Sequence, residues 1–503
     1  MSTAGPPVAF PGFDASRAVF DTVLDFLDGA QAAGLSHAEL EARLDTDGRA
    51  LLRQLLQDHL ELRADRETRC GVVGVDGLAR GRVESGHTRA LATVFGEVVV
   101  RRLAYRAPGR ANLHPADAAL NLPEEKHSHG LRRLAAVEAA RGSFEEAAAA
   151  IDRATAVQLG KRQVEELTAR TAVDFESFYA HRRPPPAADG DQVLVLQVDG
   201  KGIVMRPDAL RPATAKAAQA ANPKLASRLS KGEKRFRKRI AEVGAVHDTT
   251  PVVRSPADIL PATDAERASA VDGPRAANKW LTASVVEDAA TVVARVFDEA
   301  ERRDAEHQRV WVALVDGANH QLDRIRAEAT AREIEVHVLI DLVHVIEYLW
   351  KAAWCFHDEG DPAAEAWVHD KARAILAGKA RTVAASIRRT ATTRRLAGPA
   401  RKGADNAARY LTNKADNLDY PTALINGWPI ATGVIEGACR HLVADRLDIT
   451  GARWGLAGAE AVLRLRALRS NGDFNQYWTY HLAQEQHRVH ETRYADSAVP
   501  RAA

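Results

Sequence analysis

The spacing of apolar residues predicts a mostly helical first third of the chain. Residues 15–29 and 37–62 carry apolar side chains at three- and four-residue intervals, which favours amphipathic helices. Residues 88–105 are rich in Val, Leu and Thr around a central glycine, which predicts a β-hairpin. Helical spacing returns over residues 129–178. We therefore expect residues 1–183 to form a helical region that contains one hairpin.

A pair of short helices is predicted within this region, over residues 143–170. Ser143 and Glu146 have the spacing of a capping box, so a helix is expected to begin there and to end near Ala154. A second helix follows, with Lys161 and Arg162 near its start. The outline is that of a helix-turn-helix, whose second helix contacts DNA. Short helix pairs are also common as packing units, so both interpretations stay open.

After a proline-rich stretch at residues 182–190, the pattern changes to that of an α/β fold. Three consecutive prolines favour an extended spacer, so we expect a domain boundary there. Residues 193–198 and 310–315 are nearly continuous apolar runs, which is typical of strands buried on both faces. A third strand is expected over residues 334–340, followed by a helix, and residues 360–427 return to a helical, Ala- and Arg-rich pattern.

Charge is balanced over the chain but clustered locally. The 503 residues hold 69 Lys and Arg against 67 Asp and Glu, so a surface for nucleic acid must come from local clusters. Residues 201–240 supply one, with 12 basic against 2 acidic side chains. Its densest part is Lys231, Lys234, Arg235, Arg237, Lys238 and Arg239. A second basic group near the C-terminus includes Arg440 and Arg453, and Trp454 beside them is either a base-stacking side chain or a core residue.

Composition excludes several other classes of protein. The three cysteines are far apart and form no C-x-x-C pair, which argues against a disulfide framework and a thiolate zinc site. No signal peptide, membrane-spanning run or Gly-rich phosphate loop is visible, so we expect a cytoplasmic protein that does not use ATP.

Candidate chemistry lies at the ends of the two apolar runs. Each run ends in Asp-Gly, at Asp199 and at Asp316. Ligands of α/β sheets bind at the carboxyl ends of strands, and Mg²⁺ prefers carboxylate oxygens. Asp-Gly is also ordinary turn chemistry, so a structural role is the alternative. Glu436 lies in the first turn of a later helix-like stretch, where a helix dipole alone would favour an acidic residue.

The ordered set of motifs resembles a known family. Asp199 in Val-Asp-Gly-Lys-Gly, Asp316 in Val-Asp-Gly-Ala-Asn-His and Glu436 in Gly-Val-Ile-Glu-Gly-Ala-Cys-Arg resemble the DDE triad of bacterial insertion-sequence transposases, most closely the ISKra group. Asp341 and His344 carry the D-x-x-H signature shared by several such lineages. The resemblance spans about residues 85 to 480.

The resemblance implies an α/β fold with an RNase H-like catalytic core interrupted by a helical insertion. The core would comprise residues 191–349 and 429–484, the insertion residues 350–428, and a polar tail residues 485–503. In this fold the first aspartate lies on the first strand, the second on the fourth strand and the glutamate on a later helix. Asp341 and His344 would support the site, with a hydrogen bond between them as our leading account.

The resemblance also implies a function. Asp199, Asp316 and Glu436 would hold two Mg²⁺ ions, with Mn²⁺ as a substitute, for hydrolysis and strand transfer of DNA. The expected partners are double-stranded DNA, as element ends and target, and further copies of the chain, in the nucleoid. The alternatives are an RNase H-like nuclease without strand transfer and a non-catalytic DNA-binding protein derived from a transposase.

Overall fold

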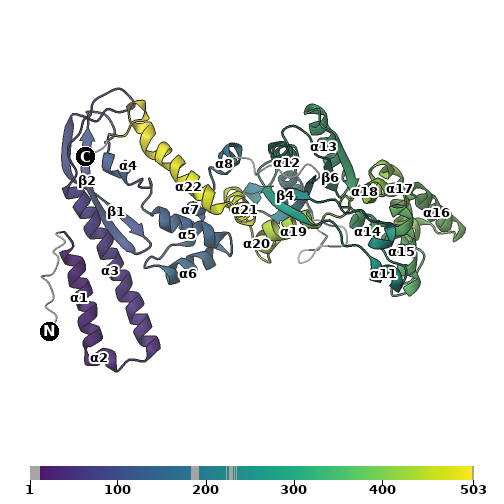
Figure 1. Cartoon of the computed structure of the whole chain (residues 1–503), viewed down its shortest axis with the longest axis horizontal. Coiled ribbons are helices and arrows are strands. Elements are labelled where there is room, and N and C mark those ends of the chain that lie inside the picture. The colour runs from purple at the N-terminus through teal and green to yellow at the C-terminus, as the bar shows by residue number, and fades with distance from the viewer. Residues whose placement is uncertain are drawn as a thin grey trace. The chain divides into compact units, whose positions relative to one another are not determined.

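The computed structural model describes residues 12–182, 192–222, 224–225, 230, 233 and 235–500. The chain divides into two compact units, Met1–His181 together with Gly472–Ala503, and Arg182–Asn471. Figure 1 shows the elements of both. Apart from Arg182, the expected spacer at residues 182–190 lies outside the described residues.

The first unit begins with a helical hairpin and a β-hairpin, and both were predicted. The helices are α1 (Asp14–Asp28), α2 (Ala30–Ala33) and α3 (His37–Asp65). Strands β1 (Arg82–Thr93) and β2 (Gly96–Arg106) pair antiparallel. Helix α3 packs on β2, where Leu60 meets Val98 and Val100 in a small apolar core.

A helical cluster completes the first unit. It contains α4 (Pro115–Ala119), α5 (His129–Ala139), α6 (Phe144–Ala154), α7 (Lys161–Thr171), α8 (Phe175–His181) and α22 (Phe474–Glu485). The predicted helix start at Ser143 is confirmed, since Ser143 and Glu146 form the reciprocal hydrogen bonds of a capping box. Helices α6 and α7 pack on α5 and on each other, so the predicted helix pair exists.

The C-terminal segment differs from the expectation. Residues 472–484 belong to the first unit, although the sequence led us to group them with the catalytic core. The expected polar tail continues α22 as the helical turns η5 (Gln486–His490), η6 (Glu491–Arg493) and η7 (Ala495–Ser497). The segment is polar in composition, but Glu485, His490 and Tyr494 are buried. Their partners are distant in sequence, so the composition did not reveal that the segment is ordered.

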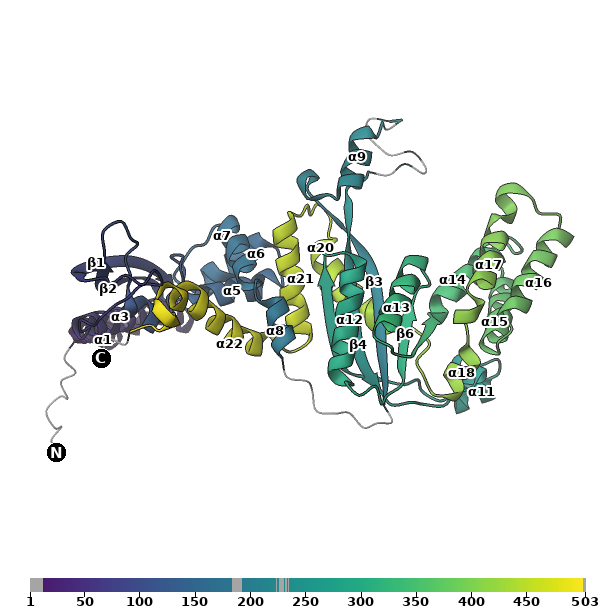
Figure 2. The same ribbon diagram turned by 90° about the horizontal axis from the view of Figure 1, so that it is seen from above.

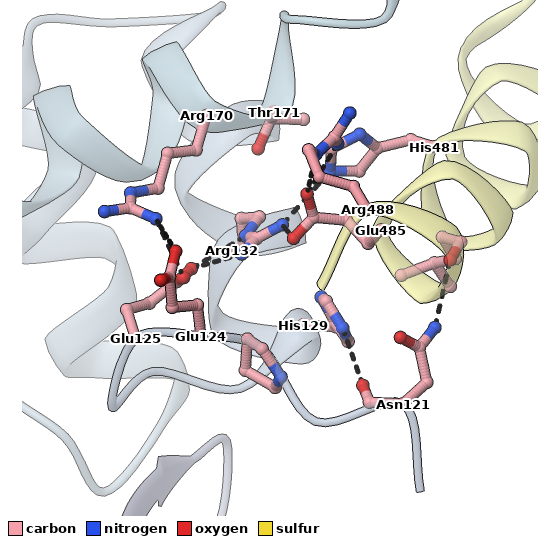
Figure 3. A network of polar contacts seen from close by, with 12 residues as sticks. Asn121, Glu124, Glu125, His129, Arg132, Arg170, Thr171, His481, Glu485 and Arg488 are labelled. Atoms are coloured by element: carbon pink, nitrogen blue, oxygen red, sulfur yellow. Dashed lines mark hydrogen bonds and ion pairs between the residues drawn. The ribbon is translucent and has the colours of Figure 1, made fainter. Parts of the chain in front are cut away.

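A buried ionic network joins α22 to α5 within the first unit (Figure 3). Arg132 is fully buried and donates hydrogen bonds to the carboxylates of Glu125 and Glu485. His481 contacts Asp174 at 2.7 Å, and Arg488 bridges Asp174 and Glu485. Because opposite charges alternate through the cluster, each buried ion has a counter-charge. The network therefore fixes the C-terminal helix against a segment more than 300 residues earlier in the chain.

The second unit is built on a five-stranded mixed sheet with the order β5-β4-β3-β6-β7. Its strands are β3 (Val193–Val204), β4 (Lys238–Thr249), β5 (Ala276–Ser284), β6 (Trp311–Val315) and β7 (Val336–Ile340). Strands β3, β4 and β5 are antiparallel neighbours, whereas β3, β6 and β7 run parallel. The predicted α/β class and the three apolar strands are confirmed.

Helices pack on this sheet, and a helical stretch follows its last strand in the sequence (Figure 2). Helix α12 (Ala289–Arg303) packs on β4, and α13 (Asn319–Ala331) and α14 (Leu342–Ala353) connect and follow the parallel strands. The stretch from α14 to the last part of the unit is helical, as expected for residues 350–428. It holds α15 (Pro362–Leu376), α16 (Ala380–Thr393), η2 (Gly398–Arg401), α17 (Lys402–Asn413), η3 (Ala415–Asn417) and α18 (Tyr420–Ile425).

The remaining elements of the second unit are short. Between β3 and β5 lie η1 (Pro207–Ala209), α9 (Pro212–Ala220), α10 (Pro256–Ile259) and α11 (Asp264–Ser269). The unit ends with α19 (Gly433–Ala438), the π-helical turn η4 (Cys439–Ala444), α20 (Asp445–Leu447) and α21 (Leu456–Ser470). Among the described helices of the chain, none is both long and apolar enough to cross a bilayer.

Replacing Arg132 is expected to destabilise the first unit. Arg132→Met removes the cation between Glu125 and Glu485 and leaves buried carboxylates without it, so unfolding should become easier by about 3–5 kcal/mol. Denaturant unfolding of the full chain, followed by circular dichroism, measures the change. Arg141→Ala is the matched control, because this surface arginine pairs with Glu138 in solvent and should change stability by less than about 1 kcal/mol. Equal stability of the two variants would contradict a structural role for the network.

Candidate active site

Two aspartates lie at equivalent positions on neighbouring parallel strands. Gln197 of β3 pairs with Leu314 of β6, and Asp199 and Asp316 each follow that pair by two residues. Adjacent strands lie about 4.8 Å apart, and residues two apart share one face of a sheet. The register therefore directs both carboxylates to one region of the sheet.

The first strand does not end at Asp199, contrary to our expectation. Strand β3 continues to Val204 because its second half pairs with β4, for example Gly202 with Ile240. Only the parallel pairing with β6 stops before Asp199. Asp199 thus lies inside a strand that is held on one side, while Asp316 lies just beyond the end of β6.

Helix α19 carries Glu436 and is fastened to β3 beside Asp199. The side chain of Gln197, 1% exposed, accepts a hydrogen bond from the Ile435 backbone N–H at 2.9 Å. Three residues after Glu436, the Cys439 thiol donates to Asp199 Oδ2 at 3.3 Å. Gln197 and Cys439 were not singled out from the sequence, because a lone buried Gln or Cys carries no motif.

The charge of Asp316 acts on Asp199, and the charge of Asp199 acts on Glu436. Burial raises the pKa of Asp199, and the negative charge of Asp316 raises it further, while hydrogen bonds from Gly200 and Cys439 oppose this. Burial also raises the pKa of Glu436, to which the charges of Asp341 and Asp199 add. The site is therefore a region of mutually repelling carboxylates that a cation would stabilise.

Asp341 supports the site in a way that differs from our expectation. It caps α14 through the Val343 N–H at 3.1 Å and accepts a hydrogen bond from the Thr432 hydroxyl at 2.9 Å. The expected hydrogen bond to His344 is wrong, since His344 contacts Glu347 at 3.6 Å and the rings of Tyr348 and Tyr410. The side chain of an N-cap residue accepts a backbone N–H from the first turn of its helix, so the Asp341 carboxylate is already used and His344 has other partners. Asp341 instead ties the start of α14 to the segment that leads into Glu436.

The turn after Asp316 shows the structural role that was one of the two alternatives for Asp-Gly. Asp316 Oδ1 accepts the Ala318 N–H at 2.8 Å, which is ordinary turn chemistry. Gly317 has a φ of +88°, and a Cβ there would lie 2.9 Å from the Tyr410 hydroxyl oxygen. That hydroxyl donates to the Asp316 carbonyl at 3.0 Å. Tyr410 belongs to α17, so the helical segment helps to position the second aspartate.

A fourth carboxylate, Glu242, was missed by the sequence analysis. It pairs with Gly200 in the β3–β4 register, and burial raises its pKa, with a further contribution from the charge of Asp199. Its position becomes visible only when the pairing of β4 with β3 is known.

The donor set fits a divalent ion in its chemistry. Carboxylate oxygens are hard ligands of the kind that Mg²⁺ prefers, and burial together with neighbouring carboxylates raises the pKa of Asp199 and Glu436. Among the described residues, however, no three acidic, histidine or cysteine side chains already meet as a metal cage. Closing of the carboxylates around an ion therefore requires side-chain movement, and the two-Mg²⁺ assignment stays a prediction.

Some of the predicted DNA-contacting side chains are exposed, whereas others form ion pairs within the protein. Lys161 and Arg162 are exposed at the start of α7, and Arg162 pairs with Glu166. Arg235, Arg237, Arg440 and Arg453 are also exposed. Lys238 forms an ion pair with Asp448 at 3.0 Å. Lys231 and Lys234 lie outside the described residues.

Arg239 and Trp454 are placed as structural residues instead. The Arg239 guanidinium donates to the carbonyls of Ala209, Val285 and Val286, which leaves it poorly placed for phosphate. Trp454 is 6% exposed and donates from Nε1 to the Leu447 carbonyl at 3.1 Å. Its ring is therefore not open to a stacking base, and this prediction is corrected. The arginines beside Trp454 suggested an exposed ring, whereas its backbone pairs with the end of β3 and draws the ring inward.

Neutralising Asp199 is expected to stabilise the ion-free protein. The folded chain raises the Asp199 pKa, so its ionisation favours unfolding as pH rises from the ordinary Asp range through the raised value. Asp199→Asn removes that cost, so its melting temperature should exceed that of the wild type at pH 7 and match it at low pH. Added Mg²⁺ should raise the melting temperature of the wild type more than that of the variant.

Asp264→Asn, at a fully exposed acidic side chain, is the control and should behave as wild type. Differential scanning calorimetry from pH 4 to pH 8, with and without Mg²⁺, measures both effects. A variant that is less stable than wild type at pH 7, or equally responsive to Mg²⁺, would contradict this account of the site.

Comparisons with known proteins do not identify a family for this chain. No family model matches the chain, and neither does any curated protein. Among solved structures, the chain is similar to the Drosophila P element transposase strand transfer complex at 8% sequence identity and a TM-score of 0.20, over 74% of this chain and 81% of that one. A similarity of this size carries no argument about fold or function.

Proposed function

We propose that this chain is a DDE transposase of an insertion sequence, which binds the ends of its element and catalyses phosphodiester hydrolysis and DNA strand transfer. The observation that carries the proposal is the register of β3 and β6. It sets Asp199 and Asp316 at the same level of adjacent strands, and Gln197 fastens the helix of Glu436 beside them. The motifs around these residues are those that resemble the DDE family.

The order of the sheet supports an RNase H-like core. In chain order, Asp199 lies on the first of the five strands, and Asp316 follows the fourth. Glu436 lies on a helix after the helical stretch that separates it from β7. These are the positions that the resemblance implies for the three acidic residues.

Asp199, Asp316 and Glu436 would hold Mg²⁺, and bound ions would supply activation of the attacking oxygen and stabilisation of the leaving oxygen. The chain's other residues keep these carboxylates in register. Gln197 orients α19, and the hydrogen bond between Asp341 and Thr432 holds the segment before Glu436. Tyr410 holds the turn of Asp316. Positioning of this kind lowers the entropic cost of bringing a phosphodiester and its attacking hydroxyl together.

Two reactions at one site account for transposition. Water attacks a phosphodiester at the element end, and the bond to the departing 3′-oxygen breaks, which leaves a free 3′-hydroxyl. That hydroxyl then attacks a phosphodiester of the target DNA in line, so one bond forms as another breaks. The exposed side chains of Arg235, Arg237, Arg440 and Arg453 in the same unit are available to backbone phosphates. Two element ends must be bridged, so we propose that a homo-oligomer acts.

Removal of any one of the three carboxylates is expected to abolish both reactions. Each ligand contributes several kcal/mol to transition-state stabilisation, so Asp316→Asn or Glu436→Gln should lower the rate by about a thousandfold or more. The substrate is a supercoiled plasmid that carries the inverted repeats flanking the gene, with Mg²⁺ present. Asp264→Asn is the control and should keep the wild-type rate.

The products of this assay separate the candidate functions. Nicking with joining supports transposition, and nicking alone means a nuclease without strand transfer. DNA binding without cleavage means a non-catalytic protein. Full activity of Asp316→Asn or Glu436→Gln would show that the site is wrongly assigned.

Gln197 is expected to act as a positioning residue. Gln197→Met keeps the volume of the buried side chain but removes the acceptor for the Ile435 N–H, so Glu436 is held less firmly. Loss of an outer hydrogen bond of this kind typically costs 10–100-fold in metal affinity or activity, so we expect about that loss of rate. The Mg²⁺ concentration for half-maximal cleavage should rise with it. A lower rate at an unchanged Mg²⁺ requirement would contradict this role.

A further inference from the structure

The first unit contains a polar pocket that the proposed chemistry does not use. It has a volume of about 440 Å³, which lies within the range of small-ligand sites. Its walls come from the β-hairpin, the segment after α4 and the C-terminal turns η5 and η6. Charged and polar residues dominate the lining, among them Arg89, Arg102, Asp117, Lys126, His490 and Arg493.

Two buried guanidinium groups in this pocket share a single carboxylate. Arg102 Nε lies 2.7 Å from Asp117 Oδ1, and Arg89 Nη1 lies 3.9 Å from Asp117 Oδ2. The Arg89 and Arg102 side chains are only 20% and 10% exposed, and that of Asp117 is 11% exposed. Since one carboxylate balances one guanidinium, the group carries an excess positive charge at a site where burial makes such charge costly.

Other acidic residues nearby do not balance this excess. Glu125 already pairs with Arg132 and Arg170, and Glu124 is 65% exposed and lies 3.9 Å from Arg493. Glu67 senses the charge of Arg102, but among the described residues it forms no ion pair with that side chain, and its carboxylate accepts the Leu103 backbone N–H at 2.8 Å. The local electrostatics therefore favour an added anion.

Donors for such an anion remain at the pocket. Within the described part of the chain, the ammonium group of Lys126 has no ion-pair partner, and the side chain is exposed. Arg102 Nε lies 2.7 Å from Asp117 Oδ1 without hydrogen-bond geometry, and Nη1 donates to the Val100 carbonyl at 3.4 Å, so the guanidinium fork is not saturated. A guanidinium and an ammonium together match the oxygens of a phosphate group.

The walls of the pocket are held in place before any ligand arrives. Arg89 Nη2 donates to the carbonyls of Pro123 and Glu125, at 2.8 and 2.7 Å, and His490 Nε2 contacts the Leu122 carbonyl at 2.8 Å. Residues 122–125, which supply these carbonyls, lead into α5, where the Arg132 network joins the chain to α22 (Figure 3). A site ordered in this way binds without a large entropic cost.

We propose that this pocket binds a phosphate group, from the backbone of DNA or from a free phosphate or nucleotide. The inference does not depend on the proposed catalysis, because the pocket and the carboxylate site share no residue. It assigns to the first unit a phosphate contact apart from the helix pair α6–α7.

Isothermal titration of the full chain with inorganic phosphate, in a chloride buffer, tests the proposal. We expect saturable binding of one phosphate per chain. Lys126→Glu should weaken it about tenfold, and Arg102→Gln should weaken it at least as much. Arg141→Glu changes the net charge by the same amount as Lys126→Glu, at the far end of α5, about 16 Å along that helix, and should leave binding unchanged. Lys126 is exposed, so its variant stays informative if Arg102→Gln does not fold.

A second arm identifies the source of the phosphate group. If duplex DNA of random sequence displaces inorganic phosphate from the wild type, and Lys126→Glu weakens DNA binding in parallel, the source is the DNA backbone. If phosphate binds and DNA does not displace it, the source is a free phosphate or nucleotide. Absence of saturable phosphate binding, or equal loss in Lys126→Glu and Arg141→Glu, overturns the proposal. Cleavage is not measured in either arm, so failure here is distinct from failure of the proposed transposase activity.

Discussion

Carboxylates that are buried close together cannot all be ionised without a counter-charge, and the second unit is arranged around this constraint. The pairing of β3 with β6 limits how far Asp199 and Asp316 can move apart, because Asp199 lies within β3 and Asp316 directly follows the last residue of β6. Hydrogen bonds from Gly200, Cys439 and Ala318 offset part of the repulsion. Burial raises the pKa of both Asp199 and Glu436, and the charges of neighbouring carboxylates add to this. In the proposed function, a cation bound among these carboxylates would lower the cost of ionising them.

The helical segment after β7 contributes to this arrangement. Tyr410 holds the carbonyl of Asp316, and the Tyr420 hydroxyl donates to the Ile340 carbonyl at 2.8 Å, next to Asp341. The carboxyl ends of β6 and β7 are therefore both held by tyrosines from helices that come later in the chain. A segment expected from its length to be only an insertion is part of the support for the acidic residues.

Features that depend on local pattern were predictable from the sequence. The apolar runs at β3 and β6, the β-hairpin and the capping box at Ser143 each depend on residues close together in the chain. The two aspartates were predictable for the same reason, since each directly follows such a run. Their approach to Glu436 was expected only from the family resemblance, because no local pattern relates residues more than a hundred positions apart.

Features that depend on tertiary partners were not predictable. Glu242 joins the site only through the pairing of β4 with β3. The polar segment from residue 485 onward is held by Arg132 and by Val72, Tyr105 and Leu113, which pack with Tyr494 of the segment and lie far from it in sequence. Trp454 and His344 were assigned from their neighbours in the chain, but the backbone of Trp454 pairs with the end of β3, and the ring of Tyr410 from α17 lies against His344.

The basic residues show why charge alone does not identify a phosphate site. Arg239 lies in the most basic segment of the chain, yet three backbone carbonyls occupy its donors. Arg132 is fully buried, but carboxylates on two sides balance its charge. Arg102 differs from both, because it shares its one carboxylate with Arg89, and a lysine without an ion pair among the described residues lies at the same pocket. What marks a site for an anion is positive charge that remains after the protein's own acceptors have been counted, and this balance can be read only from the folded chain.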